Sequence, residues 1–198
     1  MPDVSDRASE VVLVRHGETE WSRDGRHTGR TDVPLTELGR DEAEAAGDRL
    51  GGRCFALVLS SPLGRARETA ALAGYRAQVQ LRDDLLEWDY GEAEGLTTAE
   101  IRRQQPGWTV WDPGPAGGET VDAVGARADR VIDEIRSADG DVLVFAHGHL
   151  LRILTARWLG LDAAGGRFFA LDPATLSVLG YEHAQPVMRE WNALCLPA

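Results

Sequence analysis

Arg15, His16 and Gly17 directly follow a run of four aliphatic residues, Val11 to Val14, and these three residue types can do chemistry together. An arginine offers paired planar donors to an oxyanion, and a neutral imidazole is both a nucleophile and a proton carrier. A glycine lets a ligand approach the backbone closely. The apolar run is typical of a buried central strand, and open α/β sheets bind ligands beyond the carboxyl ends of such strands. Alternatively, Arg15 and His16 only cap a strand at the surface.

Two further buried strands are predicted to end in polar residues. Ser60 and Ser61 follow the apolar segment 55–59, with Arg65 in the first turn of the next helix, and His147-Gly148-His149 follows 142–146. Parallel strands have their carboxyl ends at one edge of a sheet, so we expect these groups to converge there. Two arginines and two histidines placed together would form a cationic pocket suited to a phosphate. The arginines could instead pair with carboxylates as structural residues.

The strands that position these residues alternate with helices along the chain. We predict strands over 11–14, 55–59, 79–81, 142–146 and 176–181, and helices over 37–50, 63–73, 119–136 and 150–158. Thr36 is predicted to cap the first of these helices, whose inward face would carry Leu38, Ala43, Ala46 and Leu50. This alternation predicts an α/β fold with three layers, α/β/α, around a mainly parallel sheet. Residues 1–198 are predicted to form a single domain.

The composition narrows the classes of function. The 198 residues are 43% apolar, enough for one sizeable core. The net charge of −11 argues against nucleic acid or an anionic membrane as a partner. Cys54 and Cys195 are too few for a disulfide framework and lack metal-ligand spacing, and no carboxylate cluster indicates a Mg²⁺ site. The N-terminus does not read as a secretion signal and no run of about 18 apolar residues occurs, so we expect a cytoplasmic protein.

Four blocks of sequence resemble the motifs of the histidine phosphatase superfamily, the clan that includes the cofactor-dependent phosphoglycerate mutases. In chain order they are RHGETEW at 15–21, SPLGRA at 61–66, EWDYG at 87–91 and AHGH at 146–149. Together with RHTGRTD at 26–32, they are most similar to small acid-phosphatase-like and sedoheptulose-bisphosphatase-like members. The resemblance implies a phosphoglycerate mutase-like fold for nearly the whole chain.

The resemblance also implies roles for individual residues. His16 would be the nucleophile that becomes phosphohistidine, with its other ring nitrogen holding a proton against a backbone carbonyl. The phosphoryl oxygens would be contacted by Arg15, Arg65 and His147, and Glu87 would be the general acid. Further substrate-binding residues implied are Gly17, Ser22, Thr28, Gly29, Tyr90, Gly148 and His149.

Hydrolysis and phosphoryl transfer between substrate hydroxyls are the two activities to separate. In the mutases an arginine follows the acidic glutamate, and a lysine and an arginine pair bind the distal charges. Here Trp88 follows Glu87, Thr98 stands at the lysine position, and 108–118 has no basic residue. We therefore expect a phosphatase of small phosphomonoesters, such as sugar or metabolite phosphates, that needs no metal or other cofactor. A cofactor-dependent phosphoglycerate mutase is the alternative, and a non-catalytic phosphate-binding module is disfavoured because all five catalytic residues are present.

Residues 92–118 are predicted to form a lid that sets substrate choice. Its tryptophans, with Trp88, either stack on a substrate or form a small core beneath the lid. From the sequence, Glu18 and Glu119 could each contact the substrate or make a structural pairing. His27 is expected to be an ordinary loop histidine. The expected partner is a small phosphorylated molecule. The oligomeric state is unknown, with a homodimer left open.

Overall fold

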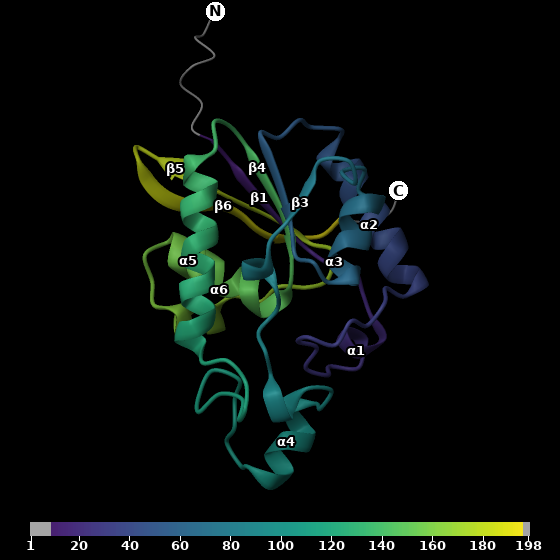
Figure 1. Ribbon diagram of the computed structural model, residues 1–198, viewed down its shortest axis with the longest axis vertical. Coiled ribbons are helices and arrows are strands. Elements are labelled where there is room, and N and C mark those ends of the chain that lie inside the picture. Colours follow the sequence, from purple (N-terminus) through teal and green to yellow (C-terminus); the bar gives the residue numbers. More distant parts are fainter. Residues whose placement is uncertain (1–8, 196–198) are drawn as a thin grey trace, which may run out of the picture.

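The computed structural model describes residues 9–195 of the chain as an α/β sandwich (Figure 1). The strands are β1 (Val11–Arg15), β2 (Leu57–Ser60), β3 (Val79–Leu81), β4 (Val142–Ala146), β5 (Leu176–Glu182) and β6 (Gln185–Ala193). The α-helices are α1 (Glu20–Arg23), α2 (Glu37–Leu50), α3 (Gly64–Leu72), α4 (Thr98–Gln104), α5 (Val121–Ser137) and α6 (Gly148–Trp158). Three short 3₁₀ helices are η2 (Asp83–Leu85), η3 (Gly91–Ala93) and η4 (Ala163–Phe168).

The six strands form one sheet in the order β3-β2-β4-β1-β5-β6. Strands β3, β2, β4 and β1 are parallel, whereas β5 runs antiparallel to β1 and β6 antiparallel to β5. The predicted three-layer architecture with a mainly parallel sheet is therefore confirmed. The parallel strands β1, β2 and β4 lie side by side, so their carboxyl ends share one edge of the sheet.

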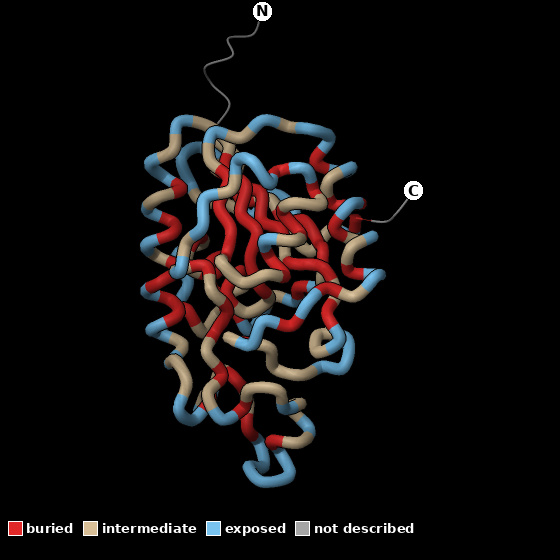
Figure 2. Tube along the Cα trace, turned by 45° about the vertical axis from the view of Figure 1, so that its right-hand side comes forward, coloured by how far each residue is buried: buried red, intermediate tan, exposed pale blue. Residues whose placement is uncertain are grey.

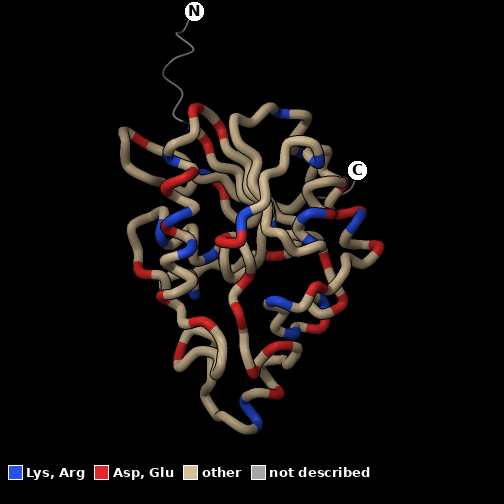
Figure 3. Tube along the Cα trace, viewed as in Figure 1, with Lys and Arg blue, Asp and Glu red and all other residues tan. Residues whose placement is uncertain are grey.

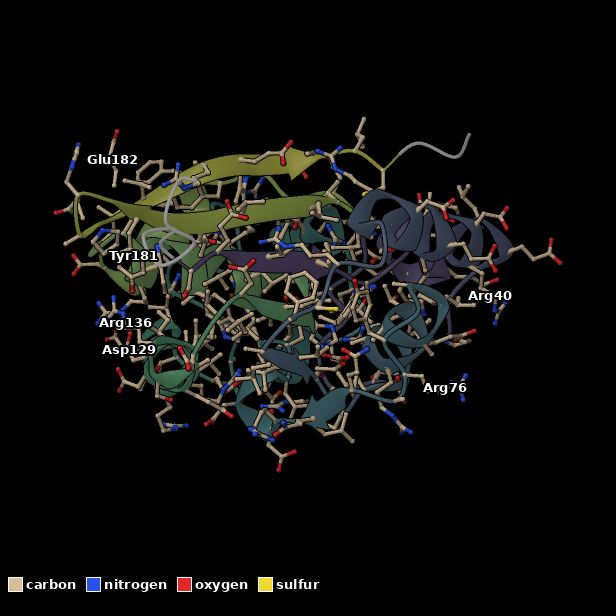
Figure 4. All side chains as sticks on the ribbon, turned by 90° about the horizontal axis from the view of Figure 1, so that it is seen from above. Arg40, Arg76, Asp129, Arg136, Tyr181 and Glu182 are labelled. Atoms are coloured by element: carbon tan, nitrogen blue, oxygen red, sulfur yellow. The ribbon has the colours of Figure 1, made fainter. Side chains whose placement is uncertain are left out.

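Alternate residues of the central strands enter two separate cores, as the two-residue period of a strand requires. Leu13 and Val144 belong to the core beneath α5 and α6, while Val14 and Phe145 belong to the core beneath α2 and α3. The central strands are accordingly buried on both faces (Figure 2). Seen from above, Arg40 on α2 and Arg136 on α5 lie at opposite sides of the molecule, with the strands between them (Figure 4).

The inward face of α2 differs in one residue from the prediction. Leu38 is 51% exposed, and Gly39 takes its place in the buried stripe with Ala43, Ala46 and Leu50. The first turn of α2 packs against the backbone that follows β1, where an added Cβ on Gly39 would lie 2.1 Å from the carbonyl oxygen of Glu18. Only a residue without a side chain fits this contact. The cap at Thr36 is confirmed, since its side chain accepts a hydrogen bond from the Gly39 N–H.

Helix α4 and the loops around it lie beyond the end of the sheet opposite the N-terminus (Figure 1). This region joins the loop after α1 through the backbone, because His27 N–H donates to Leu96 O and Gly95 N–H donates to His27 O. The carboxylate of Glu94 accepts the Gly29 N–H at 2.9 Å. Among residues 9–195, no helix is both long and apolar enough to cross a membrane.

Candidate active site

His16 stands immediately after β1 with only 4% of its surface exposed. Its Nδ1 lies 2.8 Å from the carbonyl oxygen of Gly17, so this nitrogen must carry the proton and Nε2 keeps its lone pair. Burial lowers the pKa of the ring well below 6.5, and the positive charges of Arg65 and Arg15 lower it further. The ring is therefore a neutral imidazole at neutral pH, the form that attacks an electrophile.

The backbone that carries this ring is fixed on three sides. His16 N–H donates to Ala146 O of β4, and Gly17 N–H donates to the Thr69 hydroxyl of α3 at 3.1 Å. Gly17 also lies against the first turn of α2, where an added Cβ would come within 2.1 Å of Gly39 O. Three secondary-structure elements thus set the position of the carbonyl that orients the His16 ring.

Arg15 extends from the last position of β1 across the start of α6. A Cβ added to Gly148 would lie 3.5 Å from the guanidinium carbon, so a side chain at this position would be in van der Waals contact with Arg15. Arg15 donates through Nη1 to Leu171 O, and its buried Nε has no hydrogen-bond partner in the described part of the chain. Burial lowers the pKa of this guanidinium, whereas the charge of Glu87 acts to raise it. An unpaired buried donor is costly and points to a ligand that would accept from it.

Arg65 and His147 form a hydrogen-bonded pair behind His16. Arg65 Nε donates to His147 Nδ1 at 3.2 Å, so the His147 proton lies on Nε2 and is donated to the Ser61 hydroxyl at 2.7 Å. Arg65 Nη1 donates to Thr31 O, and Nη2 donates to the carbonyl oxygens of Thr28 and Gly29. Burial lowers the pKa of His147 well below its ordinary value, and the positive charge of Arg65 lowers this pKa further. The rings of His16 and His147 lie 5.2 Å apart.

Glu87 is buried at the N-terminus of α6. Its Oε1 accepts from the N–H groups of Trp88 and Leu150, both at 2.9 Å, and its Oε2 accepts from His149 N–H at 3.0 Å. Two of these donors, His149 N–H and Leu150 N–H, belong to the first turn of α6, where N–H groups have no partner within the helix. These contacts fix the carboxyl group beside Arg15 and His16.

These groups surround a cavity of about 190 Å³. Of the predicted site residues, eight lie on its wall: Arg15, His16, Ser22, Thr28, Glu87, Tyr90, Gly148 and His149. The other four lie behind it, where Gly17 orients His16, Gly29 accepts from Arg65, and Arg65 and His147 bind each other. Among residues 9–195, no group of three or more imidazole, thiol or carboxyl side chains is arranged to hold a metal ion.

The far wall of the cavity contains residues that sequence reasoning missed. Arg26, His27 and Arg152 line it. His27 is thus part of the cavity and not an ordinary loop histidine, with its ring 5.0 Å from that of Tyr90. Arg152 lies three positions after His149 on α6, hence on the same helix face. This spacing could have indicated Arg152, but the helix was predicted to begin at 150, after His149.

Arg152 supplies a cation at this wall and forms no ion pair with a carboxylate in the described part of the chain. It donates through Nε to Gly166 O at 3.1 Å, and its guanidinium lies 5.0 Å from the centre of the Trp111 ring. None of the ion pairs of residues 9–195 involves Arg15, Arg65 or Arg152. Acidic and basic groups otherwise lie mostly along the outer helices and loops (Figure 3). In a chain of net charge −11, Arg15 and Arg152 line the cavity and can contact an anionic ligand, while Arg65 adds its charge from behind it.

The tryptophans and the two undecided glutamates have structural contacts. Trp88 and Trp108 are buried in the core that also contains the inward faces of α5 and α6, whereas Trp111 is partly buried against His149 and Arg152. Glu18 accepts from the Thr36 hydroxyl at 2.9 Å. Glu119 pairs with Arg127 at 2.8 Å, and neither glutamate lines the cavity.

Comparison with known proteins agrees with this geometry. Residues 11–194 match the sequence profile described as "Histidine phosphatase superfamily (branch 1)". An acid phosphatase of Mycobacterium tuberculosis is 43% identical over 89% of each chain. The sedoheptulose 1,7-bisphosphatase of Saccharomyces cerevisiae is 36% identical over 81% of this chain and 70% of its own.

A solved structure of an open reading frame product from Mycobacterium tuberculosis superposes with a TM-score of 0.90 and 40% identity, covering 96% of this chain and all of its own. The profile match spans all six strands and the residues around the cavity. The chain therefore belongs to the histidine phosphatase superfamily.

Proposed function

We propose that this protein hydrolyses small phosphomonoesters by two successive displacements through a phosphohistidine at His16. It is a phosphatase of small phosphorylated metabolites, and its relatives include an acid phosphatase and a sedoheptulose 1,7-bisphosphatase. The observation that carries the mechanism is the buried, neutral His16 ring, whose Nδ1–H is bound to Gly17 O and whose Nε2 keeps a lone pair. The His16 ring lines the same cavity as Arg15 and Glu87.

In the first displacement, His16 Nε2 attacks phosphorus and the ester P–O bond breaks. The leaving oxygen takes a proton from Glu87, and the phosphoryl group remains on nitrogen. In the second, water attacks phosphorus and the P–N bond breaks, while Glu87 accepts the proton of the water. Inorganic phosphate leaves, and both side chains return to their starting states.

Glu87 has room for the proton that this cycle requires. A carboxyl group offers about four lone-pair positions, of which backbone N–H groups occupy three. The remaining position is on Oε2, the oxygen that accepts only from His149 N–H. This geometry supports Glu87 as the general acid, followed by the general base.

Arginine side chains provide the positive charge that phosphoryl transfer needs. Arg15 offers an unpaired buried Nε, and Arg65 adds its charge from behind His16. We propose that this charge makes a metal ion unnecessary. Phosphate release should then be unchanged when EDTA is added, and loss of activity that Mg²⁺ restores would contradict this part of the mechanism.

Arg152 favours substrates with a second anionic group on the leaving portion, whereas Arg26 is paired with Glu100 at 3.4 Å. The distal cation that the sequence analysis did not find lies on α6, and not in 108–118. A bisphosphate or a phosphorylated acid would place its second charge near Arg152.

We further propose that residues 92–118 act as the lid over this wall and that the protein works in the cytoplasm as a phosphatase of small molecules.

Trapping of the phosphoenzyme tests the function directly. The protein is mixed with ³²P-labelled substrate, quenched in alkali, in which phosphohistidine survives, and the label on protein is counted. The wild type should carry up to one label per chain, and His16→Asn should carry none and release no phosphate. Label on His16→Asn would contradict the mechanism.

A second assay separates hydrolysis from the mutase alternative. Phosphate release without 2,3-bisphosphoglycerate is expected of a phosphatase. Isomerisation of 3-phosphoglycerate that depends on this primer would identify a mutase.

A further inference from the structure

The segment 84–89, which carries Glu87, is bound from its outer side by Arg127 of α5. Arg127 Nη1 donates to Asp84 O at 2.8 Å and Leu86 O at 2.9 Å, and Nη2 reaches Glu87 O at 3.4 Å. Its Nε and Nη2 also bind both carboxylate oxygens of Glu119, at 2.8 and 2.9 Å. This two-point pairing fixes the plane of the guanidinium, and the guanidinium fixes three carbonyl groups of the segment.

Glu119 binds the same segment directly. Its Oε2 accepts Asp89 N–H at 3.0 Å, and its backbone N–H donates to Asp89 O at 3.0 Å. Its carbonyl oxygen accepts the indole N–H of Trp88 at 2.8 Å. Glu119 and Arg127 together therefore hold 84–89 on both sides of Glu87.

Glu119 also reaches the loop that surrounds Arg65. Arg30 Nη2 lies 3.2 Å from Glu119 Oε2. The carbonyl oxygens of Thr28, Gly29 and Thr31, which flank Arg30, accept from Arg65. One carboxylate thus connects the loop that holds Arg65 to the segment that holds Glu87.

This arrangement lies outside the substrate cavity. Arg127 is 9% exposed and Glu119 is partly buried, and neither lines the cavity wall. Burial acts to raise the pKa of Glu119, but hydrogen bonds from Arg127 and Asp89 and the charges of Arg127 and Arg30 bring it below its ordinary value. Burying the Glu119–Arg127 pair costs desolvation free energy, and the hydrogen bonds from Arg127 to backbone carbonyls offset part of that cost.

We propose that Glu119 and Arg127 are positioning residues for catalysis: as a brace, they hold the Glu87 carboxyl group at the distance from the phosphate site that proton transfer to the leaving group requires. The inference rests on the proposed function, because Glu87 must be the proton donor. Without the brace, 84–89 remains in the chain but loses the contacts that fix the carbonyl groups of Asp84, Leu86 and Glu87. A misplacement of about 1 Å is enough to reduce a proton-transfer step by about 100-fold.

Leaving-group dependence distinguishes this role from general structural support. p-Nitrophenyl phosphate expels a stable phenolate that needs little protonation, whereas glycerol 3-phosphate expels an alkoxide that needs a full proton. The leaving group departs in the first displacement, which kcat/KM reports, whereas the second displacement is common to both esters. A defect in proton donation therefore lowers kcat/KM for the alkyl ester far more than for the aryl ester. A partly unfolded enzyme would lose both activities by the same factor.

The experiment measures kcat/KM for both esters in the wild type, Glu87→Gln, Arg127→Met, Glu119→Gln and a matched control, Arg130→Met. Arg130 lies one turn beyond Arg127 on α5 and pairs with the Asp84 carboxylate at the surface, without contact to the backbone of 84–89. Glu87→Gln removes the proposed acid, so the ratio of alkyl-ester to aryl-ester activity should fall by about 100-fold or more, the largest effect expected.

We expect the ratio to fall by about 10- to 100-fold in Arg127→Met, to fall in the same direction in Glu119→Gln, and to stay within about twofold in Arg130→Met. Equal losses for both esters, or no loss, in folded Arg127→Met would overturn the brace. Where Arg127→Met does not fold, Glu119→Gln and Arg127→Lys decide by the same ratio. If Glu87→Gln also leaves the ratio unchanged, the proposed proton donor is wrong; if it shifts the ratio and the brace variants do not, only the brace is wrong.

Discussion

Acidification from pH 7.5 to 5.5 should destabilise the folded protein through its buried histidines. His16 and His147 have pKa values well below 6.5 because of burial first, and then the charges of Arg65 and Arg15. In the unfolded chain each ring binds a proton near its ordinary value of 6.5. The unfolded state therefore binds more protons as the pH falls, and the stability present above pH 6.5 is progressively lost below it.

The size of the loss follows from the number of rings. A histidine that is neutral when folded and titrates at 6.5 when unfolded costs about 1.4 kcal/mol over this interval, so His16 and His147 together cost about 2.7 kcal/mol. His149, whose pKa burial also lowers well below its ordinary value, adds up to about 1.4 kcal/mol. Burial raises the pKa of Glu42, which acts in the opposite direction toward the acidic end. The total of about 4 kcal/mol is a large fraction of a typical folding free energy.

Urea unfolding followed by tryptophan fluorescence at pH 7.5, 6.5 and 5.5 measures this loss. His147→Gln removes one titrating ring, so its loss over the interval should be about 1.4 kcal/mol smaller than that of the wild type. His183→Asn, at an exposed position in the β5–β6 turn, should show the full loss. A change below about 1 kcal/mol for the wild type between pH 7.5 and 5.5 would refute the reasoning.

Three substitutions test single contacts of the fold. Ser61→Ala leaves the buried His147 Nε2–H without an acceptor and should cost about 1–3 kcal/mol in urea unfolding. Gly39→Ala would force a Cβ to within 2.1 Å of Glu18 O, so the His16 loop must shift; we expect a loss of about 1–3 kcal/mol and a lower kcat for phosphate release. Thr120→Ala removes the N-cap of α5, which accepts from Ala123 N–H, and should cost about 1 kcal/mol by thermal unfolding.

Surface changes provide the controls for these substitutions. Ser137→Ala and Asp48→Ala alter exposed positions of α5 and α2 and should change stability by less than about 0.5 kcal/mol. Equal stability of Ser61→Ala and Ser137→Ala would mean that the Ser61 hydroxyl does not support His147. Full activity in Gly39→Ala would show that the close contact with Glu18 does not position His16.

The strands that position the site could be predicted because their signals are local. An apolar run followed by Arg15 and His16 identifies β1, and Thr36 with a left-handed glycine at Gly51 marks both ends of α2. Strand β6 was not predicted, because an edge strand is half exposed and carries Arg189 and Glu190 among its apolar residues.

The far wall of the cavity was harder to predict, for a different reason. Arg152 belongs to it only because α6 begins at Gly148, which puts residue 152 on the face of His149. Arg26 and His27 reach it through tertiary contacts with Gly95 and Leu96, about 70 positions away. Short-range patterns carry no information about such contacts.

The pairing of Arg65 with carbonyl oxygens, and of Arg15 with Leu171 O, has a consequence for the evolution of stability. Carbonyl dipoles orient a guanidinium but carry no net charge, and among residues 9–195 no carboxylate forms an ion pair with Arg15 or Arg65 inside the fold. Selection for heat resistance alone would introduce a neighbouring carboxylate, and that carboxylate would occupy the place of the phosphate. The ligand-free protein is therefore less stable than it would be with these charges neutralised. Binding of inorganic phosphate or vanadate should neutralise them in part and raise the melting temperature.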